Sequence, residues 1–260
     1  MTGRQHEAWE EEKAGELFEF FQETILKCTN LARELHFDKT HKWHMNLVSL
    51  YGSILELSRA IMVSISDDSS IGTPILLRSQ LEAFVDFTNL AADRKYGYHM
   101  DAANISEWIK ILREAQTQEN PYLKGFSEEV DIDQLLIEQG EQLEKLKKDG
   151  YLPLSIFQKF ERSGQIQEYK SFYNFLCCHS HNNMRALIER HVAVLDGGAD
   201  IEVQFFPLTT LADMVQYFDA AIGLLVTATI KIHEALESPK EDEAQILNGE
   251  LAEMRKPWTD

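Results

Sequence analysis

The stretch FLCCHSHNNMRALIERH, residues 175–191, gathers side chains that could take part in chemistry. Within seventeen positions it holds three histidines, two arginines, two asparagines and two adjacent cysteines. Histidine can give and take a proton near neutral pH, and arginine can hold a phosphate or carboxylate through paired hydrogen bonds. These residue types suit acid–base catalysis on an anionic substrate. The polar edge of an ordinary helix has a similar composition, so both interpretations stay open at this point.

Apolar spacing predicts one helix for this region, from about Gln165 to His191. At 100° per residue, His181 and Arg185 flank the apolar stripe of this helix. Ser180 and His191 interrupt the stripe, and a polar group that faces a core needs a partner. In the structural interpretation, Ser180 bonds back to its own helix and His191 ends the helix. The stripe consists of Tyr173, Leu176, Cys177, Ser180, Met184, Leu187, Ile188 and His191.

A second polar group lies in TPILLRSQLEAFVDFTNL, residues 73–90. A narrow polar stripe runs along this predicted helix, with apolar residues on both sides, whereas a solvated helix shows one broad polar face. The pattern predicts that Arg78 and Glu82 are partly buried and paired at i,i+4 spacing. Such a pair is either structural or part of a polar pocket. The stripe consists of Arg78, Glu82, Asp86 and Asn89.

Helical periodicity dominates the chain, and the clear strand pattern is confined to one region. Residues 192–206 alternate apolar with other residues around Gly197-Gly198, which predicts a β-hairpin. The sequence therefore predicts an all-α fold, a multi-helix bundle with one small β-hairpin near residues 192–206. We expect a single helical-bundle domain over residues 1–238 and a loosely ordered acidic tail over residues 239–260. The expected helices span about 17–32, 42–65, 74–92, two segments within 95–150 that are broken near Asn120-Pro121, 153–164, 165–191 and 207–237.

The chain of 260 residues has 43 acidic and 25 basic residues, which gives a net charge of −18. This charge disfavours a broad nucleic-acid-binding surface, although a local pocket could still bind RNA. The first residues, MTGRQHEAWEEEK, do not resemble a signal peptide. The longest apolar run, Ala220–Ile230, is too short to span a bilayer. We therefore predict a cytoplasmic protein with free thiols and no membrane partner.

Sequence motifs that bind metals or cofactors do not occur in the chain. The cysteines and histidines near residue 180 include metal-ligand types, but neither CxxC nor HExxH spacing is present. The chain also lacks a P-loop, a GxGxxG and a GxSxG motif. We therefore predict no cofactor and no metal. One alternative stays open, a composite metal site that would join His41 and His44, which share a helix face, to His181.

The segments LLRSQLEAFVDF and YNFLCCHSHNN resemble a bacterial family of helical proteins known only as a domain of unknown function. The resemblance rests on an Arg-Ser-x-x-Glu element and a Ser-His-x-Asn element about a hundred residues apart. It covers the chain from about Ser49 to His233. Membership would imply a helical fold and no particular activity.

The chain has a looser resemblance to the HEPN superfamily of helical bundles, which often dimerise and include metal-independent ribonucleases. Active members carry an arginine and, four to six residues later, a histidine near a helix end. Arg185 and His191 enclose five residues and fit this spacing, whereas Ala186 stands where a polar residue is usual. The resemblance implies that His191 would exchange a proton with the ribose 2′-OH or the leaving oxygen, and that Arg185 would stabilise charge on the phosphate. It also implies a homodimer.

These observations together predict one polar pocket in the bundle. Arg78 and Glu82 would contribute from one helix, and His191 would lie at the mouth. The second helix would contribute Ser180, His181 and Arg185. The leading functional hypothesis is a HEPN-like, metal-independent endoribonuclease of a defence or toxin type. The alternative is a non-catalytic helical module that binds a partner protein or a small anion. The acidic composition favours the alternative, and the spacing of Arg185 and His191 favours the nuclease.

Overall fold

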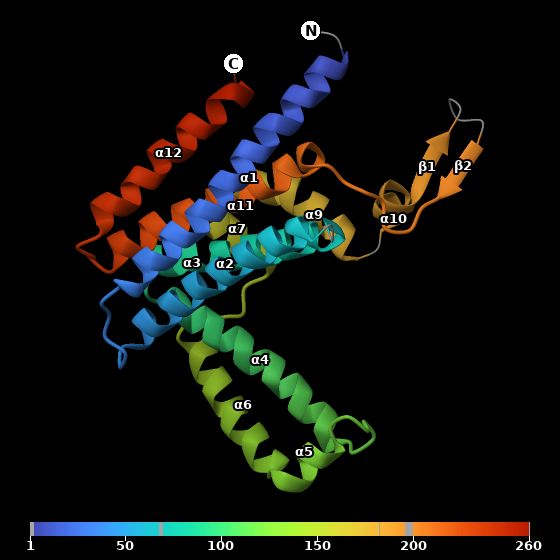
Figure 1. Cartoon of the computed structure of the whole chain (residues 1–260). Coiled ribbons are helices and arrows are strands. Elements are labelled where there is room, and N and C mark those ends of the chain that lie inside the picture. The colour runs from blue at the N-terminus through green and yellow to red at the C-terminus, as the bar shows by residue number, and fades with distance from the viewer. Residues whose placement is uncertain (1–2, 68–69, 182, 196–199, 260) are drawn as a thin grey trace.

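A computed structural model describes residues 3–67, 70–181, 183–195 and 200–259. Figure 1 shows a bundle of long helices with two projections, a helical hairpin and a β-hairpin. The predicted fold class, an all-α bundle with one small β-hairpin, is confirmed. The bundle consists of α1 (Gly3–Arg33), α2 (Lys42–Ser66), α3 (Thr73–Ala92), α11 (Leu211–Ala235) and α12 (Glu241–Thr259), and a 3₁₀ turn, η1 (Ser70–Gly72), joins α2 to α3.

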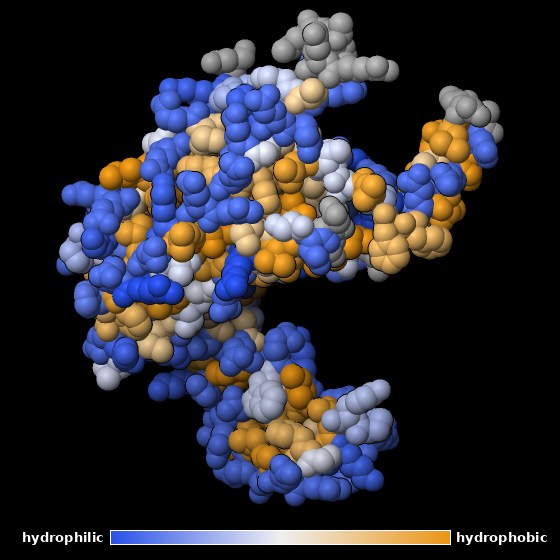
Figure 2. Space-filling model, viewed as in Figure 1, coloured by the Kyte–Doolittle hydropathy of each residue, from blue (hydrophilic) through white to orange (hydrophobic). Residues whose placement is uncertain are grey.

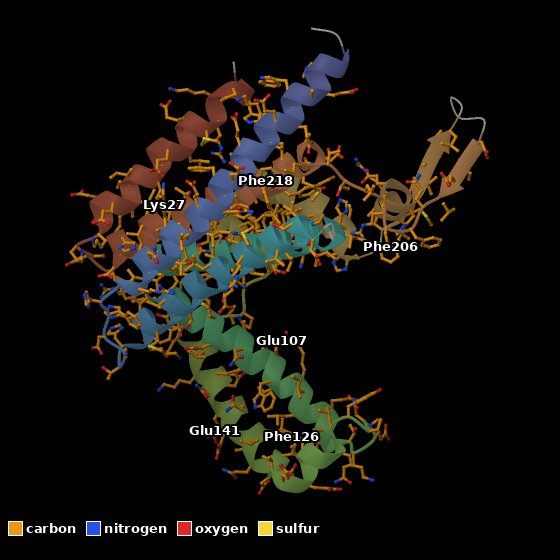
Figure 3. All side chains as sticks on the ribbon, in the orientation of Figure 1. Lys27, Glu107, Phe126, Glu141, Phe206 and Phe218 are labelled. Carbon is orange, nitrogen blue, oxygen red and sulfur yellow. The ribbon has the colours of Figure 1, made fainter. Side chains whose placement is uncertain are left out.

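The central helix of the bundle is α11, which packs against α1, α2, α3 and α12. No residue from Tyr217 to His233 is exposed, and a helix that is covered on every side is stable only inside a core. Phe218, labelled in Figure 3, lies at this centre and packs edge-on against Phe18 of α1. The hydroxyl of Thr229 lies 2.9 Å from the Tyr51 hydroxyl of α2, so this buried polar group is satisfied.

The C-terminal segment differs from the loosely ordered tail that the sequence predicts. Residues 241–259 form α12, which buries Ala244, Leu247 and Leu251 against the bundle. The spacing of these three residues gives α12 one apolar side. The acidic residues 241–243 lie in its first turn, where negative charge is stabilising. The acidic run therefore starts a helix and does not mark a disordered tail.

A glycine lets α12 approach α11 closely. Arg255 of α12 forms an ion pair with Asp219 of α11, with Nε 2.7 Å from Oδ1. A Cβ atom at Gly223 would lie 3.0 Å from Arg255 Nη2, so a larger residue there would push the guanidinium aside.

The helical projection consists of α4 (Tyr96–Gln116), the short α5 (Lys124–Glu129) and α6 (Ile132–Lys148). It confirms the two polar helices predicted for this part of the chain. α4 packs along α6, and the pair encloses two small apolar clusters that are separate from the main core. Phe126, labelled in Figure 3 near the tip, packs against Trp108 at a centroid distance of 5.7 Å. The buried residues of the two clusters are Ala102, Ile105, Ile109 and Leu143 in one, and Leu112, Ala115 and Ile132 in the other.

The prediction of one helix from Gln165 to His191 is wrong, because the segment is interrupted twice. After α7 (Ile156–Arg162), the chain forms α8 (Ile166–Glu168), a π-helical turn, η2 (Tyr169–Tyr173), and α9 (Asn174–Ser180). A π-turn holds more residues per turn than an α-helix does, so it shifts the angular position of every later residue.

The second interruption separates α9 from α10 (Met184–His191). Asn183 is the N-cap of α10, and its side chain accepts a hydrogen bond from the Arg185 backbone N–H at 3.0 Å. Because a new helix begins there, the predicted apolar stripe does not continue onto α10. Met184, expected to face the core, is exposed, and Ala186 is buried in its place.

β1 (Val192–Leu195) and β2 (Asp200–Val203) form an antiparallel hairpin that projects from the bundle beyond α10. The predicted turn at Gly197-Gly198 lies outside the described residues. One face of the hairpin carries only aliphatic side chains, because side chains alternate along each strand. This aliphatic face consists of Val192, Val194, Ile201 and Val203, in the opposed pairs Val192–Val203 and Val194–Ile201.

Two helices, α2 and α11, are long and apolar enough to cross a membrane by length and composition alone. This is weak evidence, because core helices of soluble proteins meet the same criterion. Half of the apolar window of α11 is buried inside the bundle. The cytoplasmic location stays a prediction.

His233, near the end of α11, makes the stability of the bundle depend on pH. Its side chain is fully buried, and its Nδ1 lies 2.7 Å from Ser238 Oγ. Burial lowers the pKa of His233 below its ordinary value of about 6.5. The unfolded chain therefore binds a proton at a higher pH than the folded chain does. The stabilisation is complete above about pH 6.5 and is lost as the pH falls toward the lowered folded-state pKa.

We expect His233→Asn to reduce the dependence of the free energy of unfolding on pH between about 7 and 5, because asparagine does not titrate. The dependence should not vanish, since His179 is also buried. Urea denaturation at a series of pH values measures it. An equal pH dependence in wild type and His233→Asn would contradict this assignment.

Candidate functional site

Arg78 of α3 is the centre of a polar network that joins α3 to η2 and α9. Its Nη2 lies 2.8 Å from Glu82 Oε1 and donates to the Tyr173 hydroxyl at 2.9 Å. Its Nε donates to Cys177 Sγ at 3.3 Å. Tyr173 in turn donates its proton to Glu82 Oε1 at 2.6 Å. The expected i,i+4 pairing of Arg78 with Glu82 is confirmed, and the two side chains are partly buried, with exposed fractions of 24% and 33%.

The polar stripe continues along α3 and forms further contacts. Asp86 accepts a hydrogen bond from the Tyr96 hydroxyl and pairs with Lys159 Nζ at 2.9 Å. Asn89 donates to the Lys159 carbonyl oxygen at 2.9 Å. The second half of the stripe therefore holds α3 to α4 and to α7.

This network is closed within the chain. Burial, and then the hydrogen bond to Glu82, raise the pKa of Tyr173 well above its ordinary value, so the phenol stays protonated and donates. Arg78 and Glu82 are partners in one ion pair, and Asp86 and Lys159 are partners in another. Each charged group of the stripe therefore has a partner of opposite charge within the chain, as in a structural ion-pair network. We therefore assign the stripe a structural role.

A histidine outside the predicted set, His179 on α9, is the buried one in this region. It is 7% exposed, and its Nδ1 has no hydrogen-bond partner among the described residues. Burial, and then the positive charge of Arg190, lower the pKa of His179. Arg190 Nη2 donates to the His179 carbonyl oxygen at 3.0 Å, and Phe175 packs edge-on against the imidazole. His179 is thus a buried residue with a lowered pKa at the junction of α9 and α10.

The other predicted site residues lie around α10. His181 is exposed at the end of α9. Arg185 is also exposed and pairs with Glu189, with Nε 2.8 Å from Oε1. His191 ends α10, and its Nδ1 lies 3.1 Å from the Gln204 carbonyl oxygen.

The five predicted residues lie on α3, at the end of α9 and on α10. Arg78 and Glu82 form a pair on α3, whereas His181, Arg185 and His191 lie at the junction of α9 and α10 and along α10. Arg185 and His191 are six residues apart on one helix, which corresponds to about 9 Å along the axis and about 120° around it. The predicted acid–base group and the predicted phosphate-binding group therefore point in different directions within one chain.

No group of three metal-ligand side chains occurs in the part of the chain that the structure describes. His41 and His44 do lie together, with ring centroids 4.8 Å apart, at the start of α2. The start of α2 contacts the C-terminal end of α3, whereas α9 contacts the first half of α3. His181, at the end of α9, is therefore remote from the other two histidines, and the composite site does not form.

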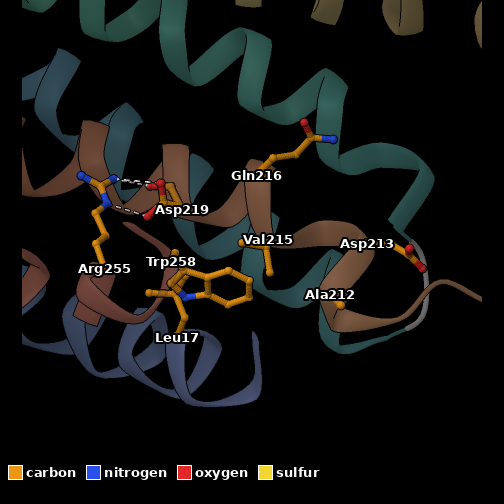
Figure 4. Close-up of a pocket in the computed structure, with 8 residues that line it drawn as sticks. All are labelled: Leu17, Ala212, Asp213, Val215, Gln216, Asp219, Arg255 and Trp258. Atoms are coloured by element: carbon orange, nitrogen blue, oxygen red, sulfur yellow. Dashed lines mark hydrogen bonds and ion pairs between the residues drawn. The ribbon is translucent and has the colours of Figure 1, made fainter. Parts of the chain in front are cut away.

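Figure 4 shows a cavity of ≈380 Å³ between α1, α11 and α12. Leu17, Val215 and Trp258 give it an apolar lining, and the Asp219–Arg255 ion pair lies on one side. Asp213 and Gln216 complete the polar part of the lining.

A second cavity, of ≈270 Å³, lies between the start of α2 and the start of α4. The Arg94 guanidinium covers the Trp43 ring there, 4.4 Å from its centroid. Lys42 forms an ion pair with Asp101 at 2.7 Å, and both residues line the same cavity. Asp101 therefore offsets part of the positive charge of this cavity, which would otherwise attract a small anion.

The β-hairpin and its flanks expose a large apolar surface. We call this region, α10 with β1, β2 and residues 204–208, the arm. Figure 2 shows the arm as a largely apolar projection beside a mostly hydrophilic bundle surface, and Phe206, labelled in Figure 3, is 94% exposed. Monomers seldom expose a large contiguous apolar patch unless it binds something. The exposed apolar residues of the arm are Met184, Ile188, Val194, Leu195, Ile201, Val203, Phe205, Phe206 and Leu208.

Two features of the structure, the aliphatic face of the hairpin and the burial of His179, carry only weak signals in the sequence. VAVL and DIEV both alternate, but the pairing register decides that their aliphatic residues share a face, and the sequence does not state the register. The burial of His179 follows a π-turn at residues 169–173, which an α-helical projection at 100° per residue does not contain.

A family described as a family of unknown function, DUF5677, matches residues 44–199, which is more than half of the chain. The chain belongs to DUF5677. This confirms the prediction of a helical domain of unknown function, and membership assigns no activity. Comparisons with curated proteins and with solved structures gave no match. The HEPN resemblance stays a prediction.

Both sequence elements that indicated DUF5677 lie inside the matched segment, and both have structural roles here. The Arg-Ser-x-x-Glu element supplies the ion pair of Arg78 with Glu82. In the Ser-His-x-Asn element, the Ser180 hydroxyl donates to the Leu176 carbonyl oxygen at 3.3 Å, and Asn183 caps α10. The first element attaches α9 to α3, and the second ends α9 and starts α10.

We expect Glu82→Ala to lower the free energy of unfolding by about 1–3 kcal/mol, because it leaves Arg78 without its carboxylate and Tyr173 without its acceptor. The loss should fall below that of a fully buried pair, since water reaches both charges. Glu82→Gln keeps an acceptor for the phenol and should cost less. Chemical denaturation of the variants measures these differences.

Glu107→Ala is the matched control, because Glu107 pairs with Lys110 on the exposed side of α4. Its effect should stay within about 0.5 kcal/mol. If Glu82→Ala has as small an effect as Glu107→Ala, the network does not hold α9 on α3.

Proposed function

We propose that this member of DUF5677 is a non-catalytic helical module that docks a protein partner through the arm. The observation that carries the proposal is the uncovered aliphatic face of the hairpin, extended by Phe205, Phe206 and Leu208. An isolated two-stranded hairpin is marginally stable in water, and covering its apolar face removes that surface from solvent. The arm therefore gains stability when a partner covers it.

The base of the arm has a defined geometry that favours binding. The Gln204 backbone N–H donates to the His191 carbonyl oxygen at 2.7 Å, and His191 Nδ1 donates to the Gln204 carbonyl oxygen at 3.1 Å. These two bonds tie the end of β2 to the end of α10. A surface that is already positioned loses less conformational entropy when it binds.

Within the arm, the composition of the hairpin and of the segment that follows it favours a protein surface over a membrane or a nucleic acid. Residues 192–208, VAVLDGGADIEVQFFPL, contain no lysine or arginine. Anionic lipids and phosphate backbones attract proteins mainly through basic residues, and the net charge of −18 adds repulsion. An apolar protein surface requires no such charge. The proposal places this docking in the cytoplasm, as the sequence predicts.

A photoreactive benzoylphenylalanine in place of Phe206 tests the docking function in cells. We expect a discrete crosslinked product, because a docked partner would lie against this side chain. Tyr122, in the loop between α4 and α5, has the same exposed fraction of 94% and is the matched control position. The absence of a product at position 206, or the same products at both positions, would overturn the proposal.

The metal-independent ribonuclease is the alternative, and one observation favours it. Because the Gln204 carbonyl can only accept, Nδ1 of His191 carries the proton, and the neutral ring keeps its lone pair on Nε2, as a general base requires. The opposing observation is that the Arg185 guanidinium binds Glu189.

We therefore expect the purified protein to leave a mixed RNA pool intact in the presence of EDTA. Cleavage that survives EDTA, leaves a cyclic phosphate end and disappears in His191→Ala would instead support the nuclease. In that case Arg185→Ala should lower the rate about a hundredfold or more.

A further inference from the structure

We infer that the partner on the arm is a second copy of this chain, whose aliphatic face packs against the aliphatic face of the first. This inference rests on the docking function proposed for the arm. Three properties of the described residues support it: the chemistry of the face, the area that it exposes, and the position of the charges.

The aliphatic face is complementary to itself. Its four side chains carry no charge and no hydrogen-bonding group, and the acidic residues of the strands, Asp200 and Glu202, belong to the opposite face. Two copies related by a twofold axis would place the same surface on both sides of the interface. Two stacked sheets lie about 10 Å apart with interdigitated side chains, so the pair would form a small sandwich.

The exposed area is sufficient for a stable dimer. The apolar side chains of the arm expose on the order of 1,000 Å², since an aromatic ring alone contributes about 150–250 Å². The largest apolar patch of a typical monomer measures about 300–600 Å². A stable interface takes about 800 Å² from each partner, so it would include Phe205, Phe206 and Leu208 in addition to the four residues of the aliphatic face.

The projecting position of the arm reduces the electrostatic cost of self-association. Each chain has a net charge of −18, so two bundles in contact would repel each other. The strands have four residues each, so the hairpin extends about 13 Å beyond α10. Charges more than about 8 Å apart are largely screened at physiological salt. Two chains joined at their arms therefore keep most of their acidic surface beyond that range.

Sedimentation velocity of the purified full chain over micromolar concentrations tests the inference. We expect a reversible dimer that Ile201→Glu weakens at least about tenfold, because each copy would bury a carboxylate without a partner. Ile137→Glu on α6 is the matched control, since Ile201 and Ile137 are 65% and 57% exposed in one chain. Both variants should keep the helical circular dichroism of the wild type. A wild type that stays monomeric, or a dimer that survives Ile201→Glu, would overturn the inference.

The crosslink at position 206 separates this inference from the docking function on which it rests. With two epitope tags on co-expressed chains, a product at twice the mass of the chain that carries both tags supports the second copy. A product that contains another protein overturns the second copy and leaves the docking function in place. No product overturns both.

Discussion

The burial of α11 on every side is the constraint on which the rest of the structure depends. A helix without an exposed residue from Tyr217 to His233 needs neighbours all round, and α1, α2, α3 and α12 supply them. This requirement explains why the acidic C-terminal segment is a packed helix. It also explains why Thr229 is paired with Tyr51 and Nδ1 of His233 with Ser238 inside the bundle.

On the outer side of the bundle, ion pairs and hydrogen bonds add to the apolar contacts that hold the helices together. The polar stripe of α3 binds η2 and α9 through Arg78 and Glu82, and it binds α7 and α4 through Asp86. Residues of these types occur in catalytic sites, but here the charged groups form ion pairs with one another. Partly buried ion pairs hold helices together, because breaking one leaves a poorly solvated charge behind. Arg78 and Glu82 therefore position α9, and with it α10 and the arm.

The apolar surface of the arm is not covered by the helical bundle in the part of the chain that the structure describes. Its hairpin has an aliphatic face in water, no basic residue, and a base that His191 and Gln204 hold in position. The same histidine that fits a ribonuclease spacing thus has a structural contact that orients an interaction surface. A composition suited to chemistry and a geometry suited to docking occur in one short segment.

The sequence by itself determined the helical class, most helix boundaries in the first two thirds of the chain, the position of the hairpin, and the pairing of Arg78 with Glu82. Each of these follows from local periodicity, which depends on neighbours a few residues apart. The tertiary structure alone decided where the helix after Gln165 breaks, since a π-turn and the Asn183 cap change the phase of everything that follows. It also decided that α12 packs against the bundle and that Met184 is exposed while Ala186 is buried. The reason is physical. Periodicity indicates which side of an element is apolar, whereas contacts between distant segments decide what covers that side. On the aliphatic face of the arm, Val194, Ile201 and Val203 stay exposed in the described chain.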